Sequence, residues 1–187
     1  MPAIMGNELL DEKMRNRIDA LVERILFVTE TKSSFPIDIF SICEQLGFSF
    51  ARISKEKTRE YKGILVVNKF NNVGRFTSRR IIGINPEFNL QETRGVIAHE
   101  LGHYFLHADR SGNQINFKVV ENKNENTPKE QEANYFAAAL LVPTFDFKTR
   151  IHDPNFEKLE YNEKIRKLSD FYCVKEDCIK RRFDEIS

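Results

Sequence analysis

The stretch NLQETRGVIAHELGHYFLH, residues 89–107, decides the fold. Asn89 is followed three residues later by Glu92, a spacing typical of a capping box at the start of a helix. The apolar residues that come next recur at helical spacing. Those expected to face inward are Ile97, Leu101 and Tyr104 or Phe105. The sequence therefore predicts a helix that carries His-Glu-Leu-Gly-His at residues 99–103.

The two histidines of this pentapeptide are placed to share a metal ion. His99 and His103 are four residues apart, so they lie on one face of the helix, about 6 Å apart along its axis. Two imidazoles on adjacent turns can bind one zinc ion. Glu100 lies beside the first of them and can accept the proton of a water molecule that attacks a carbonyl. The pattern predicts a zinc hydrolase in which Glu100 is the catalytic base.

A zinc site of this kind needs a third protein ligand. The continuation HExxHxxGxxH is absent, because position 106 is Leu and position 109 is Asp. His107 lies about 6 Å beyond His103 along the helix axis. We therefore expect His107 to be structural or to face the substrate, not to bind the same metal.

A second helix, predicted from Thr127-Pro128 to Pro143, offers the third ligand. Glu130 and Asn134 lie on one face of it, so Glu130 could bind zinc while Asn134 holds a ligand histidine in its tautomer. Alternatively, Glu130 only closes a capping box with Thr127. Glu132 is a competing ligand, although it points about 200° away from Glu130. Small side chains would let this helix approach the first one closely: Ala133, Ala137 and Ala138.

The rest of the chain reads as a mixture of helices and short strands, which indicates an α+β fold. We expect a helix over 7–29, a helix from Pro36 to Gly47, strands at 48–53, 63–67 and 81–84, a long hairpin loop over 69–80, a short strand at 115–120, and two helices within 161–186. The second and third strands should form an antiparallel hairpin. We expect residues 1–150 to form one domain and residues 151–187 a helical appendage packed on it.

Composition narrows the possible functions. The 187 residues suit one domain with a small appendage, and the formal net charge is only +1. Acidic and basic residues are equal in number over 160–187, which argues against direct binding of nucleic acid. No apolar run reaches the roughly 18 residues of a membrane span, and no secretory signal is visible. We expect a cytoplasmic protein without a membrane partner, whose three cysteines are reduced and buried.

The two helical motifs, in this order, resemble those of the ImmA/IrrE family of bacterial metallopeptidases. The resemblance is carried by Ile82–Pro86, Ala98–Tyr104 and EQEANYFAAALLVP at 130–143, and it covers roughly residues 35–145. It implies a zincin-like, gluzincin-type fold with a small antiparallel sheet. The family motif maps its zinc ligands onto His99, His103 and Glu130, and its general base onto Glu100. It also implies a substrate, a helix-turn-helix repressor that controls genes of mobile elements or stress responses.

We therefore expect a zinc-dependent endopeptidase that acts on one cytosolic protein. The alternative is a binding protein, anti-repressor or antitoxin-like, that neutralises its partner without cutting it. A peptide substrate could add as a strand to an exposed sheet edge at 63–67. A donor for the oxyanion is also required. Three residues come into question: Tyr135 and His152, between which the sequence does not choose, and Tyr104, which lies next to His103 and is expected to point into the core.

Overall fold

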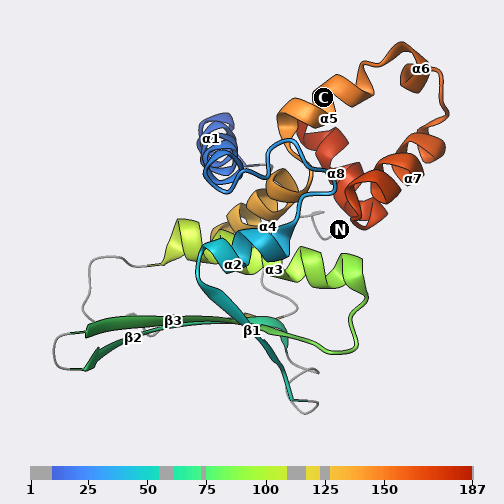
Figure 1. Cartoon of the computed structure of the whole chain (residues 1–187). Coiled ribbons are helices and arrows are strands. Elements are labelled where there is room, and N and C mark those ends of the chain that lie inside the picture. Colours follow the sequence, from blue (N-terminus) through green and yellow to red (C-terminus); the bar gives the residue numbers. More distant parts are fainter. Residues whose placement is uncertain (1–9, 55–60, 73–74, 109–116, 123–126, 187) are drawn as a thin grey trace, which may run out of the picture.

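The computed structural model describes residues 10–54, 61–72, 75–108, 117–122 and 127–186. In this part of the chain, four strands form one sheet and eight helices lie on one side of it (Figure 1). The helix of the HELGH sequence, α3 (Leu90–His107), lies directly over the sheet, and α4 (Pro128–Leu141) packs on α3. The fold is therefore α+β, as the sequence predicts.

The sheet is mixed, so the expected antiparallel sheet is wrong in one respect. The strands are β1 (Phe48–Arg52), β2 (Tyr61–Asn72), β3 (Arg75–Ile84) and β4 (Phe117–Asn122). Their order is β1-β3-β2-β4, with β2 antiparallel to both β3 and β4. β1 pairs parallel to β3, with Phe50 opposite Ile82. β2 runs in the direction opposite to β1, and the hairpin turn then reverses the chain again into β3. β3, which lies between β1 and β2, therefore runs parallel to β1.

Two expectations for the hairpin are wrong. The segment 69–80 is not a long loop, because pairing between β2 and β3 continues out to Asn72 and Arg75. Residues 63–67 are not an edge of the sheet, because β4 pairs with β2 along that segment. β4, which comes some fifty residues later in the chain, already pairs with this segment. A substrate peptide therefore cannot add as a strand at 63–67.

The helices begin and end at residues whose side chains explain the boundaries. Helix α1 (Glu12–Val28) starts where the Asp11 carboxylate accepts the N–H of Met14; residues 7–9 of the expected helix lie outside the described part. Helix α2 (Ile39–Gln45) starts later than expected, because Asp38 and not Pro36 caps it. Gly47 follows α2 with a φ of +73°, a conformation that favours glycine and stops the helix.

The C-terminal part consists of four helices: α5 (Thr144–Ile151), α6 (Pro154–Glu157), α7 (Tyr161–Tyr172) and α8 (Glu176–Ile186). The last two confirm the two helices expected within 161–186. No helix was expected over 144–157, where the structure has α5 and α6, and His152 directly follows the last residue of α5. Arg182 of α8 is fully buried and donates to the Val142 carbonyl at 3.1 Å. It also binds Thr144 and Glu185, so α8 is fixed to the end of α4.

The core lies between the sheet and the helices and continues into the C-terminal helices. Its fully buried members include Leu65 and Ile82 of the sheet, Ile97 of α3, Phe136 of α4 and Ile179 of α8. Within the described ranges, the helices are all too short or too polar to pass through a lipid bilayer.

Candidate metal centre

The centre is built where α3 and α4 touch. A side chain at Gly102 would bring its Cβ within 3.0 Å of the Cα and carbonyl oxygen of Ala133, so only glycine allows this contact without movement. The capping box of α3, in which Asn89 and Glu92 exchange hydrogen bonds, is present as expected. Thr127 caps α4 by accepting the N–H of Glu130 at 3.3 Å. The caps thus fix where α3 and α4 begin, and the contact at Gly102 brings side chains of the two helices close together.

Three of the expected residues converge at this contact. The Nε2 atoms of His99 and His103 lie 2.9 Å apart. The Glu130 carboxylate lies 3.2 Å from Nε2 of His99 and 3.1 Å from Nε2 of His103. Ligand atoms bound tetrahedrally at 2.0–2.1 Å are about 3.3 Å apart. Two imidazoles and a carboxylate in this arrangement therefore fit a zinc-type ion, and the Glu130 side chain does more than cap α4.

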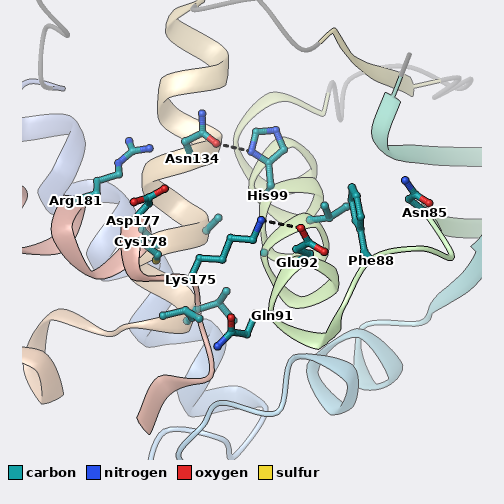
Figure 2. A pocket seen from close by; sticks show the side chains of 16 residues that line it. Asn85, Phe88, Gln91, Glu92, His99, Asn134, Lys175, Asp177, Cys178 and Arg181 are labelled. Atoms are coloured by element: carbon teal, nitrogen blue, oxygen red, sulfur yellow. Dashed lines mark hydrogen bonds and ion pairs between the residues drawn. The ribbon is translucent and has the colours of Figure 1, made fainter. Parts of the chain in front are cut away.

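Asn134 lies behind His99, one helical turn after Glu130. The His99 Nδ1–H donates to Oδ1 of Asn134 at 2.9 Å, as Figure 2 shows. With the proton on Nδ1, the lone pair of His99 is on Nε2, the atom that faces Glu130 and His103. Asn134 thus holds His99 in the tautomer that a metal requires.

His103 is supported in the same way by His107. Nε2 of His107 lies 2.9 Å from the Glu132 carboxylate, and its Nδ1 lies 2.9 Å from Nδ1 of His103. Because a carboxylate accepts, neutral His107 carries its proton on Nε2 and accepts at Nδ1. His103 then donates from Nδ1 and keeps its lone pair on Nε2. His107 and Glu132, which were both considered as possible ligands, therefore form a pair that orients His103.

Burial sets the charge state of the centre. Burial, and next the neighbouring His99, lower the pKa of His103 from 6.5 to about 4. The pKa of the Glu130 carboxyl is also lowered, chiefly by its hydrogen bond with His99. At neutral pH His103 is therefore a neutral imidazole and Glu130 is an ionised carboxylate, the forms that bind metal.

Glu100 lies on the sheet side of α3 and is fully buried. It faces Gly63 of β2, where a Cβ would come within 2.5 Å of Oε1 of Glu100 and 2.6 Å of Val96. Glycine at this position makes room for the Glu100 carboxylate beside His99. This role of Gly63 could not be predicted from the sequence, because Gly63 and Glu100 meet only through the fold.

The three candidates for the oxyanion donor lie elsewhere. Tyr104 packs edge-on against Phe48, with ring centroids 5.0 Å apart. The Tyr135 hydroxyl donates to Asp19 at 3.3 Å. His152 is exposed, and its Nδ1 lies 2.7 Å from the carbonyl of Lys148 on its own helix. All three are structural in this arrangement.

Two comparisons with known proteins agree with this geometry. The family model for the IrrE N-terminal-like domain, Peptidase_M78, matches residues 59–184, which include both helices of the centre. The protein named Metallopeptidase ImmA from Bacillus subtilis (strain 168) is 44% identical over 68 residues. That match covers 35% of this chain and 36% of the relative, about a third of each. The chain belongs to the ImmA/IrrE family of metallopeptidases.

Proposed function

We propose that this chain is a zinc-dependent endopeptidase that hydrolyses a peptide bond in a specific cytosolic protein. The observation that carries the proposal is the convergence of His99, His103 and Glu130, whose ligand atoms all lie within 4.8 Å of one another. Three protein ligands leave a fourth position open, which is the arrangement of catalytic rather than structural zinc sites. A fold of the zincin type, with a glutamate from the following helix, is part of the proposal.

The chain's own residues have separate tasks in this reaction. Bound zinc would polarise the scissile carbonyl and make a water molecule more acidic. Glu100, buried beside His99, takes the proton of the attacking water and later delivers it to the leaving amine. Asn134 and His107 keep the two imidazoles oriented, so the ligand atoms stay in place during turnover.

The proposed substrate is a helix-turn-helix repressor, whose cleavage would release genes of a bacterial mobile element or stress response. This choice rests on the family resemblance, and the relative's name states only that it is a metallopeptidase. We also propose a cytoplasmic location. For the chain itself we propose a metallopeptidase domain over 1–150, with the helices of 151–187 packed on it; the contacts of the buried Arg182 with Val142 and Thr144 support this packing.

The experiment uses the zinc-loaded chain and a repressor from the genome that encodes it. The wild type is expected to cut the repressor at one bond, and Glu100→Gln is expected to bind zinc and cut at least about a hundredfold more slowly. Mass spectrometry of the products identifies the bond. Full derepression of the target gene by Glu100→Gln in cells would instead favour the binding protein that acts without cutting.

A further inference from the structure

Strand β1 lies at one edge of the sheet. Among the strands that the structure describes, it pairs only with β3, and its other side has no neighbour. An open strand edge invites pairing with a further strand, and proteins commonly block such an edge with lysine, proline or a β-bulge. β1 contains no lysine or proline, and its register with β3 is continuous from Phe48 to Arg52. Nothing in β1 itself therefore prevents a further strand from pairing there.

The backbone of β1 offers hydrogen-bonding groups along this edge. Alternate residues of a strand direct their N–H and C=O groups to opposite sides. The N–H of Ile53, which directly follows β1, donates to the carbonyl of Ile84 in β3 at 3.0 Å. By alternation, the groups that point outward from the sheet are those of Phe48, Phe50 and Arg52. These three residues set the register in which another strand can be added.

Two aromatic side chains are exposed beside the same edge. Phe40 of α2 is 37% exposed and Phe50 of β1 is 41% exposed. Their rings pack edge to face, with centroids 5.7 Å apart, so both lie on the side of the sheet that carries the helices. Aromatic side chains are enriched in protein interfaces. The edge therefore combines outward-pointing backbone groups with an apolar contact surface.

Charges of opposite sign lie at the two ends of β1. Glu44 is exposed and lies one helical turn after Phe40, on the same face of α2. Because α2 leads through Gly47 directly into β1, the end of α2 lies beside the start of the strand (Figure 1). Glu44 is therefore near the Phe48 end of β1. Arg52 is exposed at the opposite end of the strand.

We propose that β1 pairs antiparallel with β1 of a second copy of this chain, about a two-fold axis at Phe50. In this register Phe50 lies opposite Phe50 of the second copy, and Phe48 lies opposite its Arg52. The Arg52 side chain of each copy then lies beside Glu44 of the other, at both ends of the interface. The aromatic pairs of the two copies meet at its centre. The proposal is independent of the peptidase function, since no residue of the candidate metal centre takes part.

This register is favoured because the edge is complementary to itself. A two-fold interface requires that the same surface supplies both sides of every contact. Pairing about Phe50 matches the three outward residues with one another, whereas a shift by two residues leaves one of them beyond the end of the partner strand. It also places opposite charges together at both ends and apolar side chains together in the middle. Hydrogen bonds, apolar contact and charge thus agree on a second copy as the partner.

Self-association of the full chain is measured by analytical ultracentrifugation from about 1 µM to 1 mM, a range that covers weak dimers. We expect the sedimenting species to change from a single chain to one of twice its mass as the concentration rises. A chain that stays monomeric at about 1 mM would overturn the proposal. The edge would then be left to an extended segment of a different protein.

Charge reversal tests the register. In Arg52→Glu two acids meet at both ends of the interface, and in Glu44→Arg two bases meet there. Each variant alone is expected to dimerise at least about tenfold more weakly than the wild type. An equimolar mixture of the two variants should associate within about threefold of the wild type, because each reversed charge then meets its opposite on the other copy. A mixture that associates no better than either variant alone would overturn the proposal.

The matched control is Arg166→Glu, which makes the same charge reversal at an exposed position on α7. It should dimerise as the wild type does. Equal weakening by Arg166→Glu and Arg52→Glu would show that net charge, and not the edge of β1, governs association, and would overturn the proposal.

Amide hydrogen exchange locates the interface on the backbone. NMR is recorded at concentrations below and above the dimerisation midpoint. The amides of Phe50 and Arg52 should exchange more slowly in the dimer, because they become hydrogen-bonded to the second copy. The amide of Ala51, which by alternation points to β3 in both states, should change less. Dimerisation without added protection at Phe50 and Arg52 would place the interface elsewhere and overturn the proposal.

Discussion

Nδ1 of His107 lies 2.9 Å from Nδ1 of His103, one helical turn earlier in α3. This contact excludes His107 from the set of ligands and gives it a different task. Its other nitrogen lies 2.9 Å from the Glu132 carboxylate, which accepts, so in the neutral imidazole Nδ1 is the acceptor for His103. Each histidine of the candidate centre thus has its own partner, Asn134 for His99 and His107 for His103.

Removal of His107, the partner of His103, should weaken metal binding without removing an expected ligand. In His107→Phe, Nδ1 of His103 loses its acceptor, so the tautomer with the lone pair on Nε2 is no longer favoured. We expect zinc affinity to fall about 10–100-fold, as for other residues that orient metal ligands. Competition with a fluorescent chelator measures it. Glu132→Gln should have a smaller effect, and Glu157→Gln, an exposed carboxylate on α6, none. Unchanged affinity in His107→Phe would show that the contact does not orient His103.

Two glycines of α3 should respond in opposite directions to the same substitution. Gly102→Ala forces a methyl group against the backbone of Ala133 at 3.0 Å, so we expect a loss of about 1–3 kcal/mol in the free energy of unfolding. Gly95→Ala meets no neighbour and should gain up to about 1 kcal/mol. Urea denaturation followed by circular dichroism compares them. Equal effects would mean that helix propensity, and not the contact with α4, decides the stability.

Zinc binding should resist acid more than a site with ordinary histidines. Ligands bind zinc in their deprotonated forms, so acid weakens binding as it protonates them. The pKa of His103 is lowered to about 4, and that of Glu130 is lowered too, so both remain deprotonated at pH 5. Protonation of these two side chains should therefore not weaken zinc binding from pH 7 to about 5, and should weaken it as the pH approaches about 4. NMR of the histidine rings in the metal-free chain follows the protonation of His103, and a transition of His103 centred near pH 6.5 would contradict the lowered pKa.

The buried Arg182 should be essential for attachment of α8. In Arg182→Met the bonds to Val142 and Thr144 are lost, and the Glu185 carboxylate keeps its ion pair with Arg181 but loses the one with Arg182. We expect a loss of about 3 kcal/mol in the free energy of unfolding. Arg166→Met, at an exposed position of α7, should change it by less than about 0.5 kcal/mol. If Arg182→Met changes the free energy of unfolding as little as Arg166→Met does, Arg182 is not what holds α8 in place.

Local signals predicted the helices of the centre well. Asn89 with Glu92, and Thr127 with Pro128, mark helix starts through contacts within a few residues, and the structure contains both. The spacing of His99 and His103 is likewise a property of one helix. Glu130 could be selected over Glu132 because it shares a face of α4 with Asn134, and the structure places it against both imidazoles.

Contacts between distant segments could not be predicted in the same way. β1 pairs parallel to β3, and β4 pairs with the other edge of β2. Both pairings depend on the order of strands in space, which hydrophobic alternation does not encode. Asn71 and Asn72 indicated a long loop, although they lie in β2 at the end of the hairpin pairing. The bond between His107 and Glu132, and the room that Gly63 leaves for Glu100, also arise only when the elements pack.

The most direct test of the central claim is the amount of zinc bound per chain, measured by elemental analysis after reconstitution at neutral pH. We expect about one zinc per chain in the wild type and almost none in Glu130→Ala, because two imidazoles alone hold the ion weakly. Glu132→Ala should retain zinc with reduced affinity, since Glu132 acts only through His107. Absence of zinc from the wild type, or full retention in Glu130→Ala with loss in Glu132→Ala, would contradict the site formed by His99, His103 and Glu130.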